Sequence, residues 1–311
     1  MTQLHSVAAL AAAVVLLGAC ATARERPQSP YAAAGAYDVK VWHDEWFDCA
    51  RNRRIPLTIY EPVGAPRPLP VVIFSHGLAN GRDGYTYLGR QWASHGFVSV
   101  HPEHVGASHE VERKGLIALY RAGNDHRYWE MYPDDLRFII DHLASSPLHN
   151  RVDTMRVVVA GHSLGAYAAL AEAGLDVGGR SFRDPRVVAG IPISMSENFP
   201  RSAYRSIDIP LLHITGTHDS SIFYCTLPRA RRVPFENISA PEEFLLTIRG
   251  ANHSTPSNDE SPADARAHDL IRASTTAFLD AYLRHDNAAK DWLRDGGLAR
   301  FAGNDARLEM K

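Results

Sequence analysis

The feature that most limits the possible folds is a series of continuous apolar runs separated by helical patterns. The runs occur in "LPVVIFSHG", "GFVSVHPEH", "MRVVVAG", "PLLHITG" and "EFLLTIRG". A strand that is apolar along its whole length must be covered on both faces, as in a parallel sheet flanked by helices. The intervening "YTYLGRQWASHG" has apolar residues at helical spacing. The alternation therefore predicts an α/β fold with a mostly parallel central sheet and helices on both faces.

The 311 residues fit one large α/β domain with a short segment at each end. We predict that the domain spans residues 36–285 and opens with a strand pair in "YDVKVWHDE" and "RIPLTIYEPVG". A helix is expected to begin at Pro133, because proline and acidic residues favour the first helical turn. Residues 286–311 are predicted to be a helical tail with an irregular end, packed on the domain.

The N-terminal residues have the features of a secretory signal. Residues 1–20 contain a short apolar run that ends in small residues. The ending "LGAC" looks like a bacterial lipobox, so we predict lipid attachment at Cys20 and a flexible tether over residues 21–35. The alternative is a freely secreted protein, since "MTQLHS" has no Lys or Arg and "ATA" offers an ordinary cleavage site. The expected location is the bacterial cell envelope, at the outer membrane or in the periplasm.

Composition and charge narrow the possible partners. The formal net charge is -2 and the sequence pI is about 6.8, so the chain lacks the basic character of a nucleic-acid-binding protein. With 45% hydrophobic residues it is expected to be globular. We predict a monomer that takes a small-molecule substrate, uses no cofactor or metal, and meets a membrane only through its N-terminal anchor.

The stretch "VVVAGHSLGAYAALAEA" moves from an apolar strand through a turn to an Ala-rich helix. Its G-x-S-x-G pattern is the nucleophile elbow when a strand precedes it and a helix follows it. Glycine is expected at Gly161 and Gly165 because a Cβ at either position would make strand and helix collide. Ser163 is therefore the candidate nucleophile.

A serine nucleophile needs a base, and the base needs a carboxylate that orients it. Asp219 follows the strand "PLLHITG" and His253 follows the strand "EFLLTIRG", which gives the chain order Ser, Asp, His. Glu197, after "IPISMSE", is a rival for the acid. Three other histidines are less well placed: His162 in the elbow, His213 within a strand and His268 on a helical segment.

Two backbone N–H groups are the candidates for an oxyanion hole, which stabilises the charge that develops during acyl transfer. Leu164 opens the helix after Ser163, where the helix dipole helps. Leu78 follows Gly77 in "FSHGLANG", and the glycine permits a close approach to the substrate. His76 is expected to brace this loop rather than to react.

With these motifs the chain resembles α/β-hydrolases, specifically the dienelactone-hydrolase-like and platelet-activating-factor-acetylhydrolase-like esterases. The resemblance rests on "FDCARNRRIPLTIYEP", "VVIFSHGL", "WASHGFVSVHPEH", "DLRFIIDHL", "GHSLGAYAA", "GTHD" and "GANHS". It implies a triad of Ser163, Asp219 and His253 and an oxyanion N–H from Leu78. The chain departs from many relatives at Ala166, where they have a further glycine, and its serine argues against true dienelactone hydrolases, which use cysteine.

The resulting hypothesis is an exported serine carboxylic-ester hydrolase that acts through an acyl-enzyme on short-chain or acetyl esters. The alternatives are a noncatalytic binding protein on the same fold and a lipase or polyesterase with larger substrates. A metal site built from His101, His104 and His109 is also considered, although Pro102 and the missing H-E-x-x-H pattern argue against it.

The sequence says least about the substrate pocket and the cysteines. The long segment from His104 to Tyr132 is expected to form a pocket wall, and candidate lining residues are Tyr85, Trp129 and Met195, with ordinary packing as the alternative. Cys49 belongs to the first strands at one edge of the expected sheet, and Cys225 follows a strand near the other edge, so a disulfide between them would be geometrically difficult.

Overall fold

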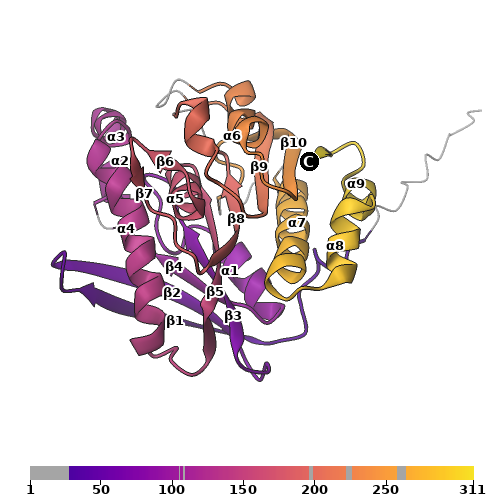
Figure 1. Cartoon of the computed structure of the whole chain (residues 1–311), viewed down its shortest axis with the longest axis horizontal. Helices are drawn as coiled ribbons and strands as arrows, with labels where there is room; N and C mark the ends of the chain where they lie inside the picture. Colours follow the sequence, from indigo (N-terminus) through magenta and orange to yellow (C-terminus); the bar gives the residue numbers. More distant parts are fainter. Residues whose placement is uncertain (1–27, 105, 108, 196–198, 222–225, 258–263) are drawn as a thin grey trace, which may run out of the picture.

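The computed structural model describes residues 28–104, 106–107, 109–195, 199–221, 226–257 and 264–311. Its main feature is a nine-stranded sheet in the order β1-β2-β4-β3-β5-β8-β9-β10-β11 (Figure 1). These strands are β1 (Val39–Asp48), β2 (Arg53–Pro62), β3 (Leu69–Ser75), β4 (Val98–Pro102), β5 (Val152–His162), β8 (Val187–Ile193), β9 (Leu211–His218), β10 (Glu243–Asn252) and β11 (Ala306–Met310). A separate pair joins β6 (Asp176–Val177) and β7 (Arg180–Ser181).

The central strands are parallel and the edge strands are not. Strands β4, β3, β5, β8, β9 and β10 pair in parallel, whereas β1 with β2, β2 with β4, and β10 with β11 pair antiparallel. The predicted α/β fold with a mostly parallel sheet is therefore confirmed. All the parallel strands end at one edge of the sheet, so the loops that follow them gather there.

Two apolar cores, one on each face, explain the continuous apolar runs. Along β3, Val71 and Ile73 join one core while Val72 and Phe74 join the other. Helices α4 (His126–His142) and α5 (Leu164–Ala173) cover the first face. Helices α1 (Thr86–Ser94) and α7 (Ala265–Leu283) cover the second. Because successive strand residues point to opposite faces, every position must be apolar.

Shorter helices connect or flank these elements. They are α2 (His109–Arg113), α3 (Leu116–Gly123), α6 (Val233–Asn237), α8 (Asn287–Arg294), α9 (Gly297–Ala302) and the 3-10 helices η1 (Leu143–Ser145), η2 (Arg201–Tyr204) and η3 (Pro228–Arg232). The long segment before Tyr132 thus contains α2, α3 and the first turns of α4. Figure 1 places α2 and α3 side by side at one end of α4.

Helix α4 begins at His126, seven residues before the predicted start at Pro133. The Asp125 side chain caps this helix by accepting a hydrogen bond from the Arg127 N–H at 3.0 Å. An aspartate before a helix is a local start signal, but the prediction gave more weight to Pro133. Proline within a helix leaves the carbonyl four residues earlier without its donor. Here that carbonyl belongs to Trp129, and it accepts a hydrogen bond from the Tyr167 hydroxyl at 2.5 Å. A side chain of α5 thus replaces the missing helical bond.

We expect Tyr167→Phe to lower the free energy of unfolding by about 1–3 kcal/mol, because it leaves the Trp129 carbonyl without a donor. Urea unfolding of the two proteins would measure the difference. Tyr128→Phe is a suitable control, because it removes a hydroxyl that donates to Gly106 O in an exposed contact. Equal effects of the two variants would contradict a specific role for the Tyr167 bond.

The two ends of the described chain are more ordered than the sequence suggested. Residues 28–35, assigned to the tether, are docked on α1 and α8: Gln91 donates to Tyr31 O at 3.0 Å, and the Tyr31 ring lies 4.9 Å from that of Trp292. The C-terminal tail does not end irregularly, since β11 adds an edge strand to the main sheet. Long-range contacts caused both differences from expectation: side chains of α1 and α8 hold residues 28–35, and main-chain pairing with β10 holds β11.

No helix among the described residues is long and apolar enough to cross a membrane. Cys20 lies outside the described residues, as does Cys225, so the structure says nothing of the predicted anchor or of the cysteine pair. Cys49 is exposed in the turn between β1 and β2.

Candidate active site

Ser163 lies between the end of β5 and the start of α5, in a strained backbone conformation. Its φ is 56° and its ψ is -113°, values that side-chain-bearing residues rarely adopt. The two glycines permit the sharp turn. A Cβ on Gly161 would lie 2.3 Å from the Gly165 carbonyl oxygen, and one on Gly165 would lie 2.0 Å from that of Ser75. The collision expected at Gly161 is thus present, whereas Gly165 is restricted by the neighbouring strand β3.

The three residues proposed as a triad meet at the carboxyl ends of the parallel strands. Ser163 follows β5, Asp219 follows β9, and His253 follows β10. The Nε2 atom of His253 lies 3.0 Å from Ser163 Oγ, and its Nδ1 lies 2.8 Å from Asp219 Oδ1. Thr215 donates to the other carboxylate oxygen at 2.8 Å. This arrangement can move a proton from the hydroxyl to the imidazole and hold the resulting charge.

Arg231, in η3, is a further member of the site that the sequence analysis did not identify. Its side chain is 1% exposed, and its Nε lies 3.2 Å from Asp219 Oδ1. It also donates to the Ser194 carbonyl at 2.8 Å, and its Nη2 lies 3.2 Å from His253 Nδ1. The run "RARR" around it resembles an ordinary surface segment, so only the fold reveals that this arginine is buried.

The carboxyl group of Asp219 is fully buried, and two opposing effects act on its ionisation. Burial alone would raise the pKa of Asp219. The hydrogen bond with His253 and the charge of Arg231 outweigh it and hold the pKa well below the usual range. The group is therefore a carboxylate at neutral pH, the form that can orient the His253 imidazole.

Both candidate oxyanion N–H groups lie beside Ser163. A Cβ on Gly77, the residue before Leu78, would be 3.3 Å from the Ser163 Cβ. Leu164 is the first residue of α5, where N–H groups have no partner within the helix. Among the described residues neither the Leu78 nor the Leu164 N–H donates to a protein acceptor. Both groups are thus available to a ligand oxygen.

The three candidate lining residues lie in different surroundings. Tyr85 is buried in the core below the site, and its hydroxyl lies 2.7 Å from His162 Nδ1. Met195 is buried after β8. Trp129 is half-buried and packs against Tyr167, with ring centroids 4.5 Å apart. Their roles toward a substrate stay predictions, and Tyr85 has an evident alternative role in holding His162.

The other histidines are engaged elsewhere. His213 lies 2.9 Å from Glu243, and His268 lies 2.7 Å from the Thr255 carbonyl. Burial and the neighbouring His253 lower the pKa of His162, which keeps that ring neutral. The rival acid Glu197 lies outside the described residues.

Two of the three histidines considered for a metal site, His101 and His104, lie on opposite faces of the sheet. His101 Nε2 lies 2.9 Å from Ser99 Oγ and its ring packs in the core on the α1 face, whereas His104 lies between Ser75 and Asp135 on the α4 face. Within the described part of the chain, no group of three His, Cys, Asp or Glu side chains could hold a metal ion.

Comparison with known proteins gives a family match over the N-terminal part of the domain. Residues 43–112 match the family described as platelet-activating factor acetylhydrolase, isoform II. This match covers β2, β3, β4 and the candidate oxyanion loop, and it supports a hydrolase of ester substrates. A search of curated proteins finds no match. The chain is thus an α/β protein with the architecture of an α/β-hydrolase, and it resembles the platelet-activating factor acetylhydrolases, as its sequence motifs predicted.

Proposed function

We propose that this protein is a serine carboxylic-ester hydrolase that acts through an acyl-enzyme on Ser163. The observation that carries the proposal is the continuous chain from Ser163 Oγ through His253 to Asp219, with separations of 3.0 and 2.8 Å. His253 takes the hydroxyl proton as Ser163 attacks the ester carbonyl, and it then donates this proton to the leaving alcohol. Water attacks the acyl-enzyme in the second half of the reaction, with His253 again as the base.

The developing oxyanion would be bound by the N–H groups of Leu78 and Leu164. Neither group has a competing acceptor among the described residues, and both lie next to the nucleophile. Leu164 adds the positive end of the α5 dipole. Preorganised donors of this kind typically contribute a few kcal/mol, about 2.7–4 for one donor, to transition-state stabilisation.

For the substrate we propose short-chain acyl esters, with acetyl esters first. The matching family is named as an acetylhydrolase of platelet-activating factor, and this name supports acetyl esters over long acyl chains. Export and attachment through Cys20 remain part of the proposal, on the strength of the N-terminal sequence alone. A panel of p-nitrophenyl esters from acetate to palmitate would test the acyl preference; highest kcat/KM on long chains would favour the lipase alternative.

A fluorophosphonate probe tests the reaction class directly. We expect the folded protein to react with one equivalent of probe, with the adduct mapped by mass spectrometry to the peptide that contains Ser163. The strained backbone of Ser163 and the hydrogen bond between its hydroxyl and the His253 base are the reasons for this selectivity. Prior heat denaturation should abolish the reaction. A folded protein that remains unlabelled, or that is labelled at another serine, would favour the noncatalytic alternative.

A further inference from the structure

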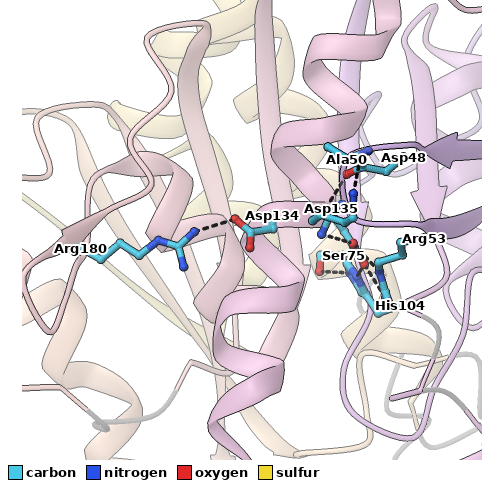
Figure 2. Close-up of polar contacts among 9 residues, drawn as sticks. Asp48, Ala50, Arg53, Ser75, His104, Asp134, Asp135 and Arg180 are labelled. Carbon is cyan, nitrogen blue, oxygen red and sulfur yellow. Dashed lines mark hydrogen bonds and ion pairs between the residues drawn. The ribbon is translucent and has the colours of Figure 1, made fainter.

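Besides the candidate triad, a second serine, histidine and aspartate are joined by hydrogen bonds next to the candidate oxyanion loop. We call Ser75, His104 and Asp135 the buried relay. His104 Nε2 lies 2.8 Å from Ser75 Oγ, and His104 Nδ1 lies 3.0 Å from Asp135 Oδ2. Figure 2 shows these three side chains meeting, with Arg53 beside them. Ser75 is the last residue of β3, His104 lies two residues after the end of β4, and Asp135 lies in the middle of α4. The neighbouring Asp134 points away toward Arg180, so only one of the two consecutive aspartates takes part.

Burial excludes a second catalytic centre. Ser75, His104 and Asp135 are each 0% exposed, and the Tyr132 ring stacks on His104 with centroids 3.7 Å apart. A substrate carbonyl cannot reach a hydroxyl enclosed in this way. These three side chains can therefore affect catalysis only through the backbone that they hold in place.

The contacts fix the position of each proton. Asp135 accepts two hydrogen bonds from Arg53, at 2.7 and 2.8 Å, and one from Arg51 at 2.8 Å. Although burial opposes ionisation, the bonds from His104 and Arg53 lower the pKa of Asp135 to about 2. Burial lowers the pKa of His104, which is therefore neutral with its proton on Nδ1, facing the carboxylate. Its Nε2 then accepts from the Ser75 hydroxyl.

The buried relay is connected to the oxyanion loop at two points, through Ser75 and through the backbone of His104. Ser75 is followed directly by His76, Gly77 and Leu78. The backbone N–H of His104 donates to His76 Nε2 at 3.0 Å, and His76 Nδ1 then donates to the Gly77 carbonyl at 2.6 Å. The carbonyl of Ser75 also lies against the elbow, where only a glycine fits at position 165. A shift of Ser75 would therefore move the loop relative to Ser163.

We propose that Ser75, His104 and Asp135 are positioning residues that hold the Leu78 N–H in place for the oxyanion. The proposal rests on the esterase function proposed above. Asp135, held by Arg51 and Arg53, fixes the orientation of the His104 ring. The ring in turn holds the Ser75 hydroxyl, and the position of Ser75 sets where the loop begins. No member of the buried relay touches the substrate, so its effect is on transition-state binding and not on substrate capture.

The test compares Ser75→Ala with Ser99→Ala. Ser99 Oγ lies 2.9 Å from His101 Nε2, and both residues are buried, so the control removes the same kind of bond away from the oxyanion loop. We expect Ser75→Ala to lower kcat for p-nitrophenyl acetate about 10- to 30-fold with KM changed less than about twofold. This is less than the roughly 100- to 1,000-fold loss on removing an oxyanion donor outright. Phenylboronic acid, whose serine adduct places an oxygen at the oxyanion position, should bind more weakly by a similar factor.

A second measurement does not depend on activity. Hydrogen exchange of the peptide covering residues 76–80 should be faster in Ser75→Ala and unchanged in Ser99→Ala, while thermal unfolding should shift similarly in both. Unchanged kcat and boronate affinity in Ser75→Ala, or an equal loss of kcat in Ser99→Ala, would overturn the positioning role. If the wild type hydrolyses esters, either of these results leaves the proposed function intact. If it hydrolyses none, the proposed function fails, and unchanged exchange would reject the positioning role separately.

Discussion

Replacing Ser163 by alanine is expected to lower kcat/KM for p-nitrophenyl acetate by on the order of 10⁴- to 10⁶-fold. In the proposed mechanism the loss is large because the Ser163 hydroxyl would form the covalent intermediate, and its hydrogen bond with His253 would be lost. The residual rate would come from the oxyanion donors and from substrate binding. Stopped assays at high enzyme concentration, with circular dichroism to verify folding, would measure it.

The double variant Ser163→Ala, His253→Ala provides the matched control. Residues that act as one unit are strongly non-additive, so the double variant should be no slower than Ser163→Ala alone by more than a few-fold. The bond of 3.0 Å between the two side chains is the structural reason. If the two losses multiplied, His253 would have a role independent of Ser163 and the assignment of base to nucleophile would fail.

Replacing Arg231 by methionine should lower the free energy of unfolding at pH 7 by about 3–5 kcal/mol, the usual cost of removing one partner of a buried ion pair. The side chains of Arg231 and Asp219 are 1% and 0% exposed, so water cannot compensate the remaining carboxylate. The Ser194 carbonyl would lose its donor as well. Arg232→Met is the control, because this adjacent arginine is 30% exposed and its pairing with Glu309 should contribute about 1 kcal/mol or less.

The same variant should change how stability depends on pH. Because the folded pKa of Asp219 is depressed, its stabilising effect is complete above the unfolded pKa of about 4 and is lost as the pH falls toward the folded value. Without Arg231 the depression is smaller and less stability is lost in acid. The difference between wild type and Arg231→Met should therefore be largest near pH 7 and narrow below about pH 4. Urea titrations at pH 7, 4 and 3 would check this; a constant difference would mean that Arg231 stabilises the fold without acting on Asp219.

The fold class could be read from the sequence because its signal is local and repeated. The apolar runs became β3, β4, β5, β9 and β10, each buried on both faces. The predictions were less accurate where long-range contacts decided the outcome. Helix α4 continues through Pro133 because Tyr167 supplies the missing donor, and β11 forms because an open sheet edge was available to it.

In the candidate site, too, the residues with a local sequence signal were predicted, and those placed by long-range contacts were not. Ser163, Asp219 and His253 were identified because each follows a strand in a fixed chain order, and the structure brings them within hydrogen-bond distance. Arg231 could not be identified, since nothing near it in the sequence indicates that a cation would be buried against Asp219. Ser75, His104 and Asp135 are equally inconspicuous, because they are separated along the chain and meet only after strands and helix have packed.

By itself, the sequence determined which residues could carry the chemistry, since residue type and position after a strand are local properties. Tertiary structure alone decided how those residues are held. Arg231 pairs with Asp219, 12 residues away, and His104 pairs with Asp135, 31 residues away. Both pairs depend on the burial of their carboxylates. Burial is a property of the packed chain, because water competes for every one of these groups until both faces of the sheet are covered.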